Sequence, residues 1–429
     1  MRRKIKLFKY ILIGAFICEL LFINGAEIFI LNGWGVSGDE NEINVNNDKV
    51  CSYTIGSYVS GVMISSNGQY FVARSGGAVY FFNKTNHSPL WNYTTGSTGN
   101  RVRSVSISSD GQYIAAGSDN RRIYLFNKAN STPLWYYIES SYEPFSVAIS
   151  SDGQYVAAGI GNGSGAEGSV RYGKVWIFNK TSPAPLWNYT TGDWILSVAI
   201  SSNGQYIAAG CADKKVYLFD KASSTPLWSY EAGESVYTVA ISSDGQYIVA
   251  GSKDNNIYLF NNTSSTPLWN YTTGSSYYSM AISSNGQYII VGGMWDGKVY
   301  LFNNTSSTPL WTYSKGEGGK VVAISSDGQY IAMGCGNGKV YLFKSTSSIP
   351  LWTYSIGDGL GGMAISSNGQ YVVAGGDKII YLIPSTYKPP SYDKLIMIMI
   401  IGGMVFAVLA VFVFLYFLYY SINKRVLST

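Results

Sequence analysis

The stretch Ser65-Ser66-Asn67-Gly68-Gln69-Tyr70 decides the fold, because this six-residue pattern, with Asp or Asn third, occurs eight times along the chain. The other copies begin at Ser108, Ser150, Ser201, Ser242, Ser283, Ser325 and Ser366. Neighbouring copies lie 41 to 51 residues apart. This period is typical of β-propellers, in which each repeat forms one four-stranded blade. The sequence therefore predicts an all-β fold, an eight-bladed β-propeller over residues 49–384.

One repeat illustrates the expected strands. Its apolar segments at 238–242, 247–251, 257–260 and 267–271 are separated by turn residues, which is the signature of short strands joined by hairpins. The Asp244-Gly245 pair supplies the positive backbone angle of a tight turn. Asp and Asn alternate at this position among the copies. We therefore interpret it as part of the turn and not as a catalytic or metal-binding carboxylate.

The fourth strand of each repeat is marked by Pro-Leu-Trp, which occurs only seven times. The tryptophans are Trp91, Trp135, Trp187, Trp228, Trp269, Trp311 and Trp352. The missing eighth strand is predicted at residues 50–55, where Cys51 stands in place of tryptophan. This N-terminal strand should complete the last blade and close the ring, which protects the sheet edges at both ends.

Two parts of the repeat resemble known families. Residues 104–118 resemble the first strands of WD repeats, and residues 217–228 resemble the tryptophan-containing repeats of quinoprotein-type (PQQ-like) propellers, which often have eight blades. The resemblance implies the fold but not dehydrogenase activity. Phe126-Asn127 and Phe178-Asn179 replace the Trp-Asp pair of WD repeats, and the sequence lacks the vicinal cysteines and acidic cluster that a quinone with calcium needs. We therefore expect no catalytic residues, no metal, no cofactor and no enzymatic activity.

Composition narrows the range of partners. Basic and acidic residues nearly balance within 49–384, and the excess positive charge lies at the chain ends, so a nucleic-acid-binding surface is not expected. His87 is the single histidine, and the cysteines are far apart, which argues against a zinc or haem site. We interpret Cys51, Cys211 and Cys335 as small, partly buried residues, and Cys18 lies in an apolar run.

The two ends of the chain carry apolar segments. Residues 1–31 begin with a basic cluster and predict a signal peptide or N-terminal membrane anchor, followed by a linker at 32–48. After a second linker, 385–394, the uncharged residues 395–420 are long enough for a transmembrane helix, and 421–429 form a basic cytoplasmic tail. The positive-inside rule then predicts a single-pass protein of the cell membrane with an extracellular propeller. A cytoplasmic propeller on a tail anchor is the alternative if the first segment does not direct export.

Asn-x-Ser/Thr acceptor sequences for N-glycosylation agree with an extracellular location. They begin at Asn83, Asn86, Asn92, Asn130, Asn162, Asn179, Asn188, Asn261, Asn262, Asn270, Asn303 and Asn304. The longest spacing marks an insertion at 159–174, which contains Glu167, Arg171 and Tyr172. It is either a functional loop or a tolerated surface loop.

In propellers of this kind, the loops joining strand four to strand one and strand two to strand three share one face. By analogy, both chain ends leave from the opposite face. The shared face should present the aromatic residues Tyr58, Tyr142, Phe145, Trp194, Tyr237, Tyr277, Tyr278 and Trp295. The same loops contain Glu143, Asp193, Glu234, Glu317 and Asp358. Aromatic side chains beside carboxylates suit protein or glycan recognition, which we favour for the face as a whole. The alternative for any single residue is that its ring only covers a loop end.

The sequence therefore favours a non-enzymatic, membrane-anchored scaffold that binds a protein or glycan at the cell surface. A quinoprotein-like cofactor-binding or enzymatic propeller, and a propeller subunit of a membrane complex, are the alternatives.

Overall fold

A computed structural model describes residues 50–389, apart from 87, 97–98, 141, 162–170, 275, 277, 294–295, 315–318 and 358. The segments predicted at 1–31, 32–48, 395–420 and 421–429, and most of the linker 385–394, lie outside these residues. Within the described ranges, no helix is long and apolar enough to cross a membrane. The described residues all belong to one compact unit, Asn47–Thr429.

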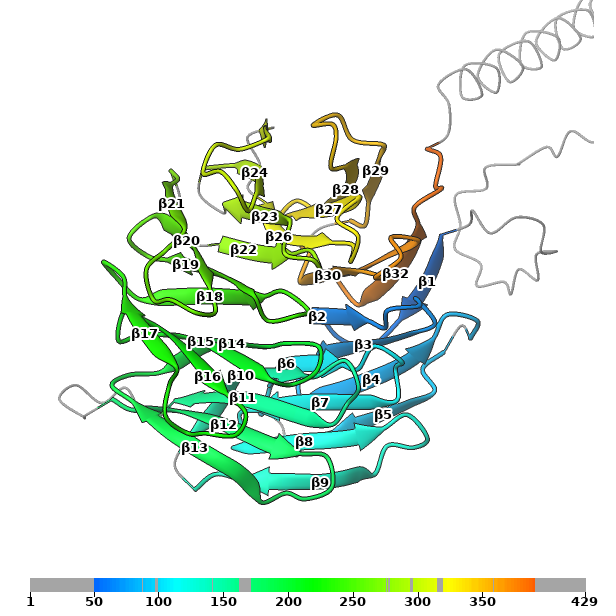
Figure 1. Ribbon diagram of the computed structural model, residues 1–429. Helices are drawn as coiled ribbons and strands as arrows, with labels where there is room; N and C mark the ends of the chain where they lie inside the picture. The colour runs from blue at the N-terminus through cyan, green and yellow to red at the C-terminus, as the bar shows by residue number, and fades with distance from the viewer. Residues whose placement is uncertain are drawn as a thin grey trace, which may run out of the picture. The chain divides into compact units, whose positions relative to one another are not determined.

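The described residues form eight antiparallel sheets of four strands, and each sheet is one blade (Figure 1). From the innermost strand outward, blade 1 contains β2 (Val59–Ile64), β3 (Tyr70–Ser75), β4 (Ala78–Asn83) and β5 (Trp91–Thr94), and blade 2 contains β6 (Val102–Ile107), β7 (Tyr113–Ser118), β8 (Arg122–Asn127) and β9 (Pro133–Ile138). Blade 3 contains β10 (Glu143–Ile149), β11 (Tyr155–Gly161), β12 (Gly173–Asn179) and β13 (Pro185–Thr191), and blade 4 contains β14 (Ile195–Ile200), β15 (Tyr206–Cys211), β16 (Lys215–Asp220) and β17 (Trp228–Glu231).

Blades 5 to 8 follow the same order. Blade 5 contains β18 (Val236–Ile241), β19 (Tyr247–Ser252), β20 (Asn256–Asn261) and β21 (Trp269–Thr272), and blade 6 contains β22 (Tyr278–Ile282), β23 (Tyr288–Gly293), β24 (Lys298–Asn303) and β25 (Trp311–Ser314). Blade 7 contains β26 (Gly319–Ile324), β27 (Tyr330–Cys335), β28 (Lys339–Lys344) and β29 (Trp352–Ser355), and blade 8 contains β30 (Gly362–Ile365), β31 (Tyr371–Gly375), β32 (Ile379–Pro384) and β1 (Cys51–Thr54).

Burial along each strand reflects its place in the blade. The middle strands are covered on both faces by neighbouring blades, so the four central residues of β16, from Val216 to Phe219, are all buried. The outermost strand β17 instead alternates between partly buried and exposed side chains, because one of its faces meets solvent. The core is accordingly divided into apolar clusters between successive blades.

The ring closes through the N-terminal strand. β1 pairs antiparallel with β32, with Cys51 opposite Leu382 and Thr54 opposite Ile379, and the two strands lie side by side in Figure 1. The innermost strands contact one another in order from β2 to β30, and β30 contacts β2. The predictions of eight blades and of an N-terminal outer strand in the last blade are therefore confirmed, although the strand, 51–54, is shorter than the predicted 50–55.

The six-residue repeat closes the ring a second time. The backbone N–H of Ser66 donates to the carbonyl of Ser109 at 2.9 Å, and the equivalent bond recurs from blade to blade. The cycle ends where the N–H of Ser367 donates to the carbonyl of Ser66 at 3.0 Å. The second serine of every copy thus belongs to a continuous circle of hydrogen bonds.

The same turns explain why Asp and Asn interchange. Oδ1 of Asp244 accepts hydrogen bonds from the Ser242 hydroxyl at 2.6 Å and from the Gln246 N–H at 2.9 Å. Oδ1 of Asn203 accepts the corresponding bonds in blade 4. Because the turn needs a single acceptor oxygen, a carboxylate and an amide serve equally, as the sequence indicated.

The glycine and tyrosine of the repeat join neighbouring blades. Gly245 has a φ of +74°, and a Cβ at this position would collide with the ring of Tyr206 in the preceding blade. The contact recurs around the ring and ends with Gly68 against Tyr371. Glycine is needed here both for the positive φ and for the close approach of the aromatic ring.

Candidate functional site

The strand directions place two sets of loops on one face. We call it the loop face; it includes 55–58, 76–77, 119–121, 192–194, 212–214 and 232–235. The six-residue turns lie at the other end of the strands. Because Cys51 pairs with Leu382, Val50 and Pro384 also lie at that other end. Both ends of the described chain therefore leave from the face opposite the loop face, as predicted.

β-Bulges add one residue to several innermost strands close to the loop face. The strands shift register at equivalent positions, and the additional residues are Ser60, Arg103, Phe145, Leu196, Tyr237 and Lys320. A bulge redirects a side chain and recurs beside functional sites. The first three of these residues line the same cleft.

This cleft, which we call the blade 1–2 cleft, is an open cavity of about 590 Å³ on the loop face. Its lining residues are Ser57, Tyr58, Ser60, Arg74, Gly76, Arg101, Val102, Arg103 and Phe145. Three of the nine are arginines and two are aromatic. The side chain of Tyr58 is 42% exposed, so a ligand in the cleft can contact it.

An aromatic stack extends from the cleft across blades 2 to 4. The Arg103 guanidinium lies over the Phe145 ring at 4.9 Å, and Phe145 stacks on Trp194 with centroids 5.4 Å apart. Arg171 covers the Trp194 ring at 5.3 Å. A cation over each outer ring face is favourable because the ring faces carry negative charge density. The stack holds these side chains in place before any ligand arrives.

The acidic residues expected among the aromatics have partners within the protein. Glu143, one of them, forms an ion pair with Arg103 at 3.0 Å, and Asp119, which was not predicted, pairs with the same guanidinium. Glu234 pairs with Lys214 at 3.3 Å. These carboxylates therefore help to fix the loops, which is a different role from the direct recognition suggested by the sequence.

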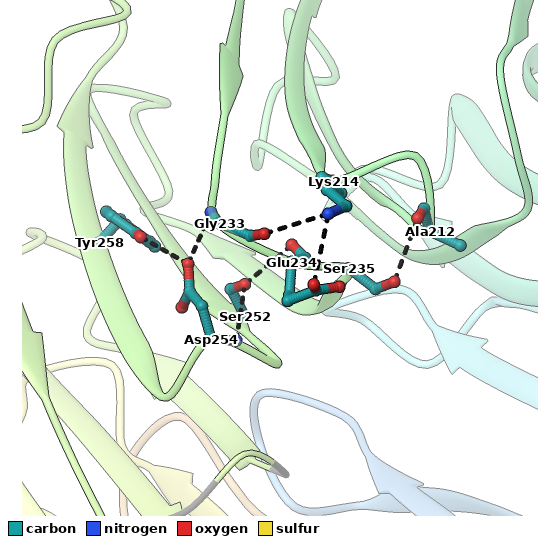
Figure 2. A network of polar contacts seen from close by, with 8 residues as sticks. All are labelled: Ala212, Lys214, Gly233, Glu234, Ser235, Ser252, Asp254 and Tyr258. Atoms are coloured by element: carbon teal, nitrogen blue, oxygen red, sulfur yellow. Dashed lines mark hydrogen bonds and ion pairs between the residues drawn. The ribbon is translucent and has the colours of Figure 1, made fainter.

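Figure 2 shows how such contacts fix the loops between blades 4 and 5. Oδ2 of Asp254 accepts hydrogen bonds from the Gly233 N–H and the Tyr258 hydroxyl, both at 2.7 Å. The Ser252 hydroxyl donates to the carbonyl of Glu234 at 2.9 Å. Burial, followed by the bond to Asp254, raises the pKa of Tyr258, so the phenol stays a donor. The network ties three loop segments together.

The same device recurs in blades 4 and 6. The Tyr217 hydroxyl donates to Asp213 at 2.6 Å, and the Tyr300 hydroxyl donates to Asp296 at 2.8 Å. In blade 1 the corresponding loop is only Gly76-Gly77, with no carboxylate. Gly76 of this short loop lines the blade 1–2 cleft and has no side chain to fill it.

Arg74 is a partly buried cation in the cleft. Its Nη1 donates to the backbone carbonyl of Val102 at 2.9 Å. Burial, followed by the like charge of Arg103, lowers the pKa of Arg74 to about 10. The guanidinium is nevertheless protonated at neutral pH. It brings a positive charge into a partly enclosed space.

The predicted aromatic residues are only partly brought together. Tyr58 and Phe145 line the cleft and Trp194 stacks on Phe145. Tyr142 lies apart from this stack, beneath the Lys174 ammonium at 5.0 Å, and Tyr237 is a partly buried bulge residue of blade 5. Tyr278 begins β22, opposite Gly293. Tyr277 and Trp295, with Glu317 and Asp358, lie outside the described residues.

The acceptor asparagines lie mainly on the outer part of the blades. Asn92, Asn188 and Asn270 are exposed on outermost strands, and Asn86 and Asn130 are exposed in turns. The remaining described ones are partly buried, either as the last residue of a third strand or in the turn after it: Asn83, Asn179, Asn261, Asn262, Asn303 and Asn304. Asn162 lies outside the described residues, as does most of the predicted insertion at 159–174. The two ends of the insertion belong to strands β11 and β12.

No group of three His, Cys, Asp or Glu side chains that could hold a metal ion occurs among the described residues. Cys211 and Cys335 are buried, and Cys51 is partly buried. Burial, followed by the charge of Asp213, raises the pKa of the Cys211 thiol. A buried, protonated thiol is a poor nucleophile and a poor metal ligand.

Repeats, ring and loop face together define an eight-bladed β-propeller scaffold with WD40-like and PQQ-like repeats. Residues 212–387 match the family model described as outer membrane protein assembly factor BamB. Residues 88–127 and 185–220 match the model described as WD domain, G-beta repeat. No curated protein matches the chain.

The three cleft arginines escaped the sequence analysis. The net charge of residues 49–384 is close to zero, because acidic residues elsewhere in the propeller balance these arginines. The total therefore gives no sign of a local basic cluster. A comparison of the eight repeats position by position would have singled out Arg74, because the other repeats have glycine there.

Proposed function

We propose that the protein is a non-enzymatic scaffold that binds a partner protein through its loop face. The observation that carries the proposal is the blade 1–2 cleft, where exposed Tyr58, partly buried Phe145 and three arginines converge on a rigid framework. Aromatic residues and arginine are the residue types that dominate binding energy at protein interfaces. The WD-type repeats support this role, because propellers of that kind commonly mediate protein interactions.

The chemistry of the loop face supports binding more than catalysis. Asp213, Asp254 and Asp296 accept hydrogen bonds from tyrosines of their own blades, and Asp254 and Asp213 also bind backbone N–H groups. Carboxylates engaged in this way hold loops in place. A glycan ligand is the second candidate, and the planar stack of Phe145 on Trp194 is the observation that favours it.

We further propose that the propeller is anchored in the cell membrane and faces outward. The uncharged residues 395–420 and the basic residues at both chain ends support this topology. Because both ends of the described chain leave from the opposite face, such an anchor would direct the loop face away from the membrane.

The test is affinity capture from cell-surface extracts with full-length protein immobilised through its C-terminus. Wild type is compared with a Tyr58→Ala/Phe145→Ala variant and with a Tyr136→Ala variant, since Tyr136 is exposed on an outermost strand. We expect a protein retained by wild type and by Tyr136→Ala but lost from the double variant. Equal retention of a partner by all three proteins would show that the partner binds outside the cleft.

A further inference from the structure

Blade 1 departs from the other seven blades at one pair of facing residues. The second strands of the others carry glycine at this position: Gly117, Gly159, Gly210, Gly251, Gly292, Gly334 and Gly375. Blade 1 has Arg74 there, and Gly61 lies opposite it on β2. In blades 2, 3, 4 and 6 the facing residue is Ser104, Ser146, Ser197 or Ser279. Blade 1 thus has a Gly–Arg pair where these four blades have a Ser–Gly pair.

The two changes in blade 1 depend on each other sterically. A Cβ added to Gly61 would collide with Nε of Arg74, so the glycine makes the space in which the arginine side chain lies. Elsewhere the serine hydroxyl links neighbouring blades; Ser146, for example, accepts from the Val198 N–H at 3.1 Å. In blade 1 the link to blade 2 is made instead by Arg74 and the carbonyl of Val102.

A serine hydroxyl would be enough to link blade 1 to blade 2 by a hydrogen bond. A guanidinium adds a positive charge and five N–H donors. Among the described residues, the Val102 carbonyl is the single hydrogen-bond acceptor for the Arg74 side chain, and no carboxylate pairs with it. Arg101 is exposed and likewise lacks an ion pair within the described ranges. Arg103, by contrast, pairs with two carboxylates, Asp119 and Glu143, so the three arginines outnumber these carboxylates by one. The cleft therefore has positive charge that the fold does not neutralise.

We propose that the blade 1–2 cleft binds a carboxylate of the partner protein, an Asp or Glu side chain in an acidic segment. The free side of the Arg74 fork receives the carboxylate, because a planar guanidinium matches its two oxygens. Arg101 supports the negative charge from the cleft rim, and the rings of Tyr58 and Phe145 contact the neighbouring residues of the segment. This inference rests on the proposed function and specifies the chemistry of its ligand.

The experiment is calorimetric titration of full-length protein with the peptide Ac-Glu-Glu-Phe-Glu-Glu-NH2 and with its glutamine counterpart, Ac-Gln-Gln-Phe-Gln-Gln-NH2. The key variant is Gly61→Ser/Arg74→Gly, which restores the pair found in other blades, including a hydroxyl able to bind blade 2. Arg122→Gln is the matched control, because Arg122 also covers an aromatic ring, Tyr136, but lies outside the cleft. Thermal unfolding verifies that each variant folds, and Arg74→Gln replaces the double variant if it does not.

We expect wild type and Arg122→Gln to bind the glutamate peptide equally, with affinity falling as salt increases. The glutamine peptide and the double variant should each reduce the affinity about tenfold or more. The proposal is overturned if wild type fails to bind the glutamate peptide, if the double variant binds as tightly as wild type, or if inorganic phosphate competes as well as the peptide. Should the peptide fail while affinity capture still depends on Tyr58 and Phe145, the proposed function stands and this inference alone falls.

Discussion

The hydroxyl of Tyr53 donates a hydrogen bond to the backbone carbonyl of Lys84 at 3.0 Å, and this bond joins the last blade to the first. At the seven other interfaces an indole Nε1 makes the equivalent bond, as Trp228 does to the Asn262 carbonyl at 2.9 Å. Cys51 occupies the tryptophan position of the N-terminal strand, and the phenol two residues later supplies the donor. The closing blade is thus attached by the same kind of bond as the others, from a different side chain.

Replacement of Tyr53 by phenylalanine should weaken the ring closure. Tyr53 is 1% exposed, so loss of its hydroxyl leaves the Lys84 carbonyl without this partner at a buried interface. We expect the free energy of unfolding in urea to fall by about 1–2 kcal/mol. Tyr136→Phe is the control, because Tyr136 is 47% exposed and should change stability little. Equal stability of both variants and wild type would show that the bond does not contribute to closure.

The six-residue turns need an acceptor oxygen and not a charge. Asp244→Asn keeps the Oδ1 that accepts from Ser242 and Gln246, so it should change the free energy of unfolding by less than about 0.5 kcal/mol. Asp244→Ala removes both bonds and should cost about 1–2 kcal/mol. Thermal and urea unfolding of the two variants decide the matter. A large loss in Asp244→Asn would indicate a role for the carboxylate that the structure does not show.

Alkaline pH should destabilise the protein through its buried phenols. Burial, followed by the hydrogen bond to Asp213, raises the pKa of Tyr217 above its ordinary value of 10.0. Because the folded state keeps the proton that the unfolded state releases, the stabilisation is complete below about pH 10 and is lost as pH rises further. We expect the melting temperature to decline from about pH 10 upward. The decline should be shallower in Tyr217→Phe, and an identical profile in that variant would rule out this phenol as a source.

The topology can be tested with protease on intact cells. We expect the propeller to be removed and a fragment containing 395–429 to remain, because the proposed anchor would protect the C-terminal segment. Immunoblotting with antibodies against the propeller and against the C-terminal tail provides the measurement. Digestion of the propeller only after lysis would place it in the cytoplasm and remove the extracellular part of the proposal.

The repeat made the fold predictable, whereas the cleft depends on exceptions to the repeat. Gly245 and Tyr206 have equivalents in every copy, so the repeat predicted eight blades, and the count of only seven Pro-Leu-Trp segments predicted the closing strand. Tyr58 and Phe145 could be assigned to the loop face because loop positions follow from the strand order. Arg74 could not be assigned to the cleft from the sequence. Its position there depends on Gly61 in the paired strand and on the short neighbouring loop, and these are contacts in three dimensions.

Site-specific photo-cross-linking in intact cells tests the central claim, binding of a partner protein through the loop face, most directly. The photoreactive residue p-benzoylphenylalanine is placed at Tyr58 in the cleft and, for comparison, at Tyr136 on an outermost strand of blade 2. We predict that irradiation produces a discrete protein adduct from position 58 and none from position 136, and that Gly61→Ser/Arg74→Gly reduces the adduct. An adduct from position 136 alone, or no adduct from position 58, would contradict the account.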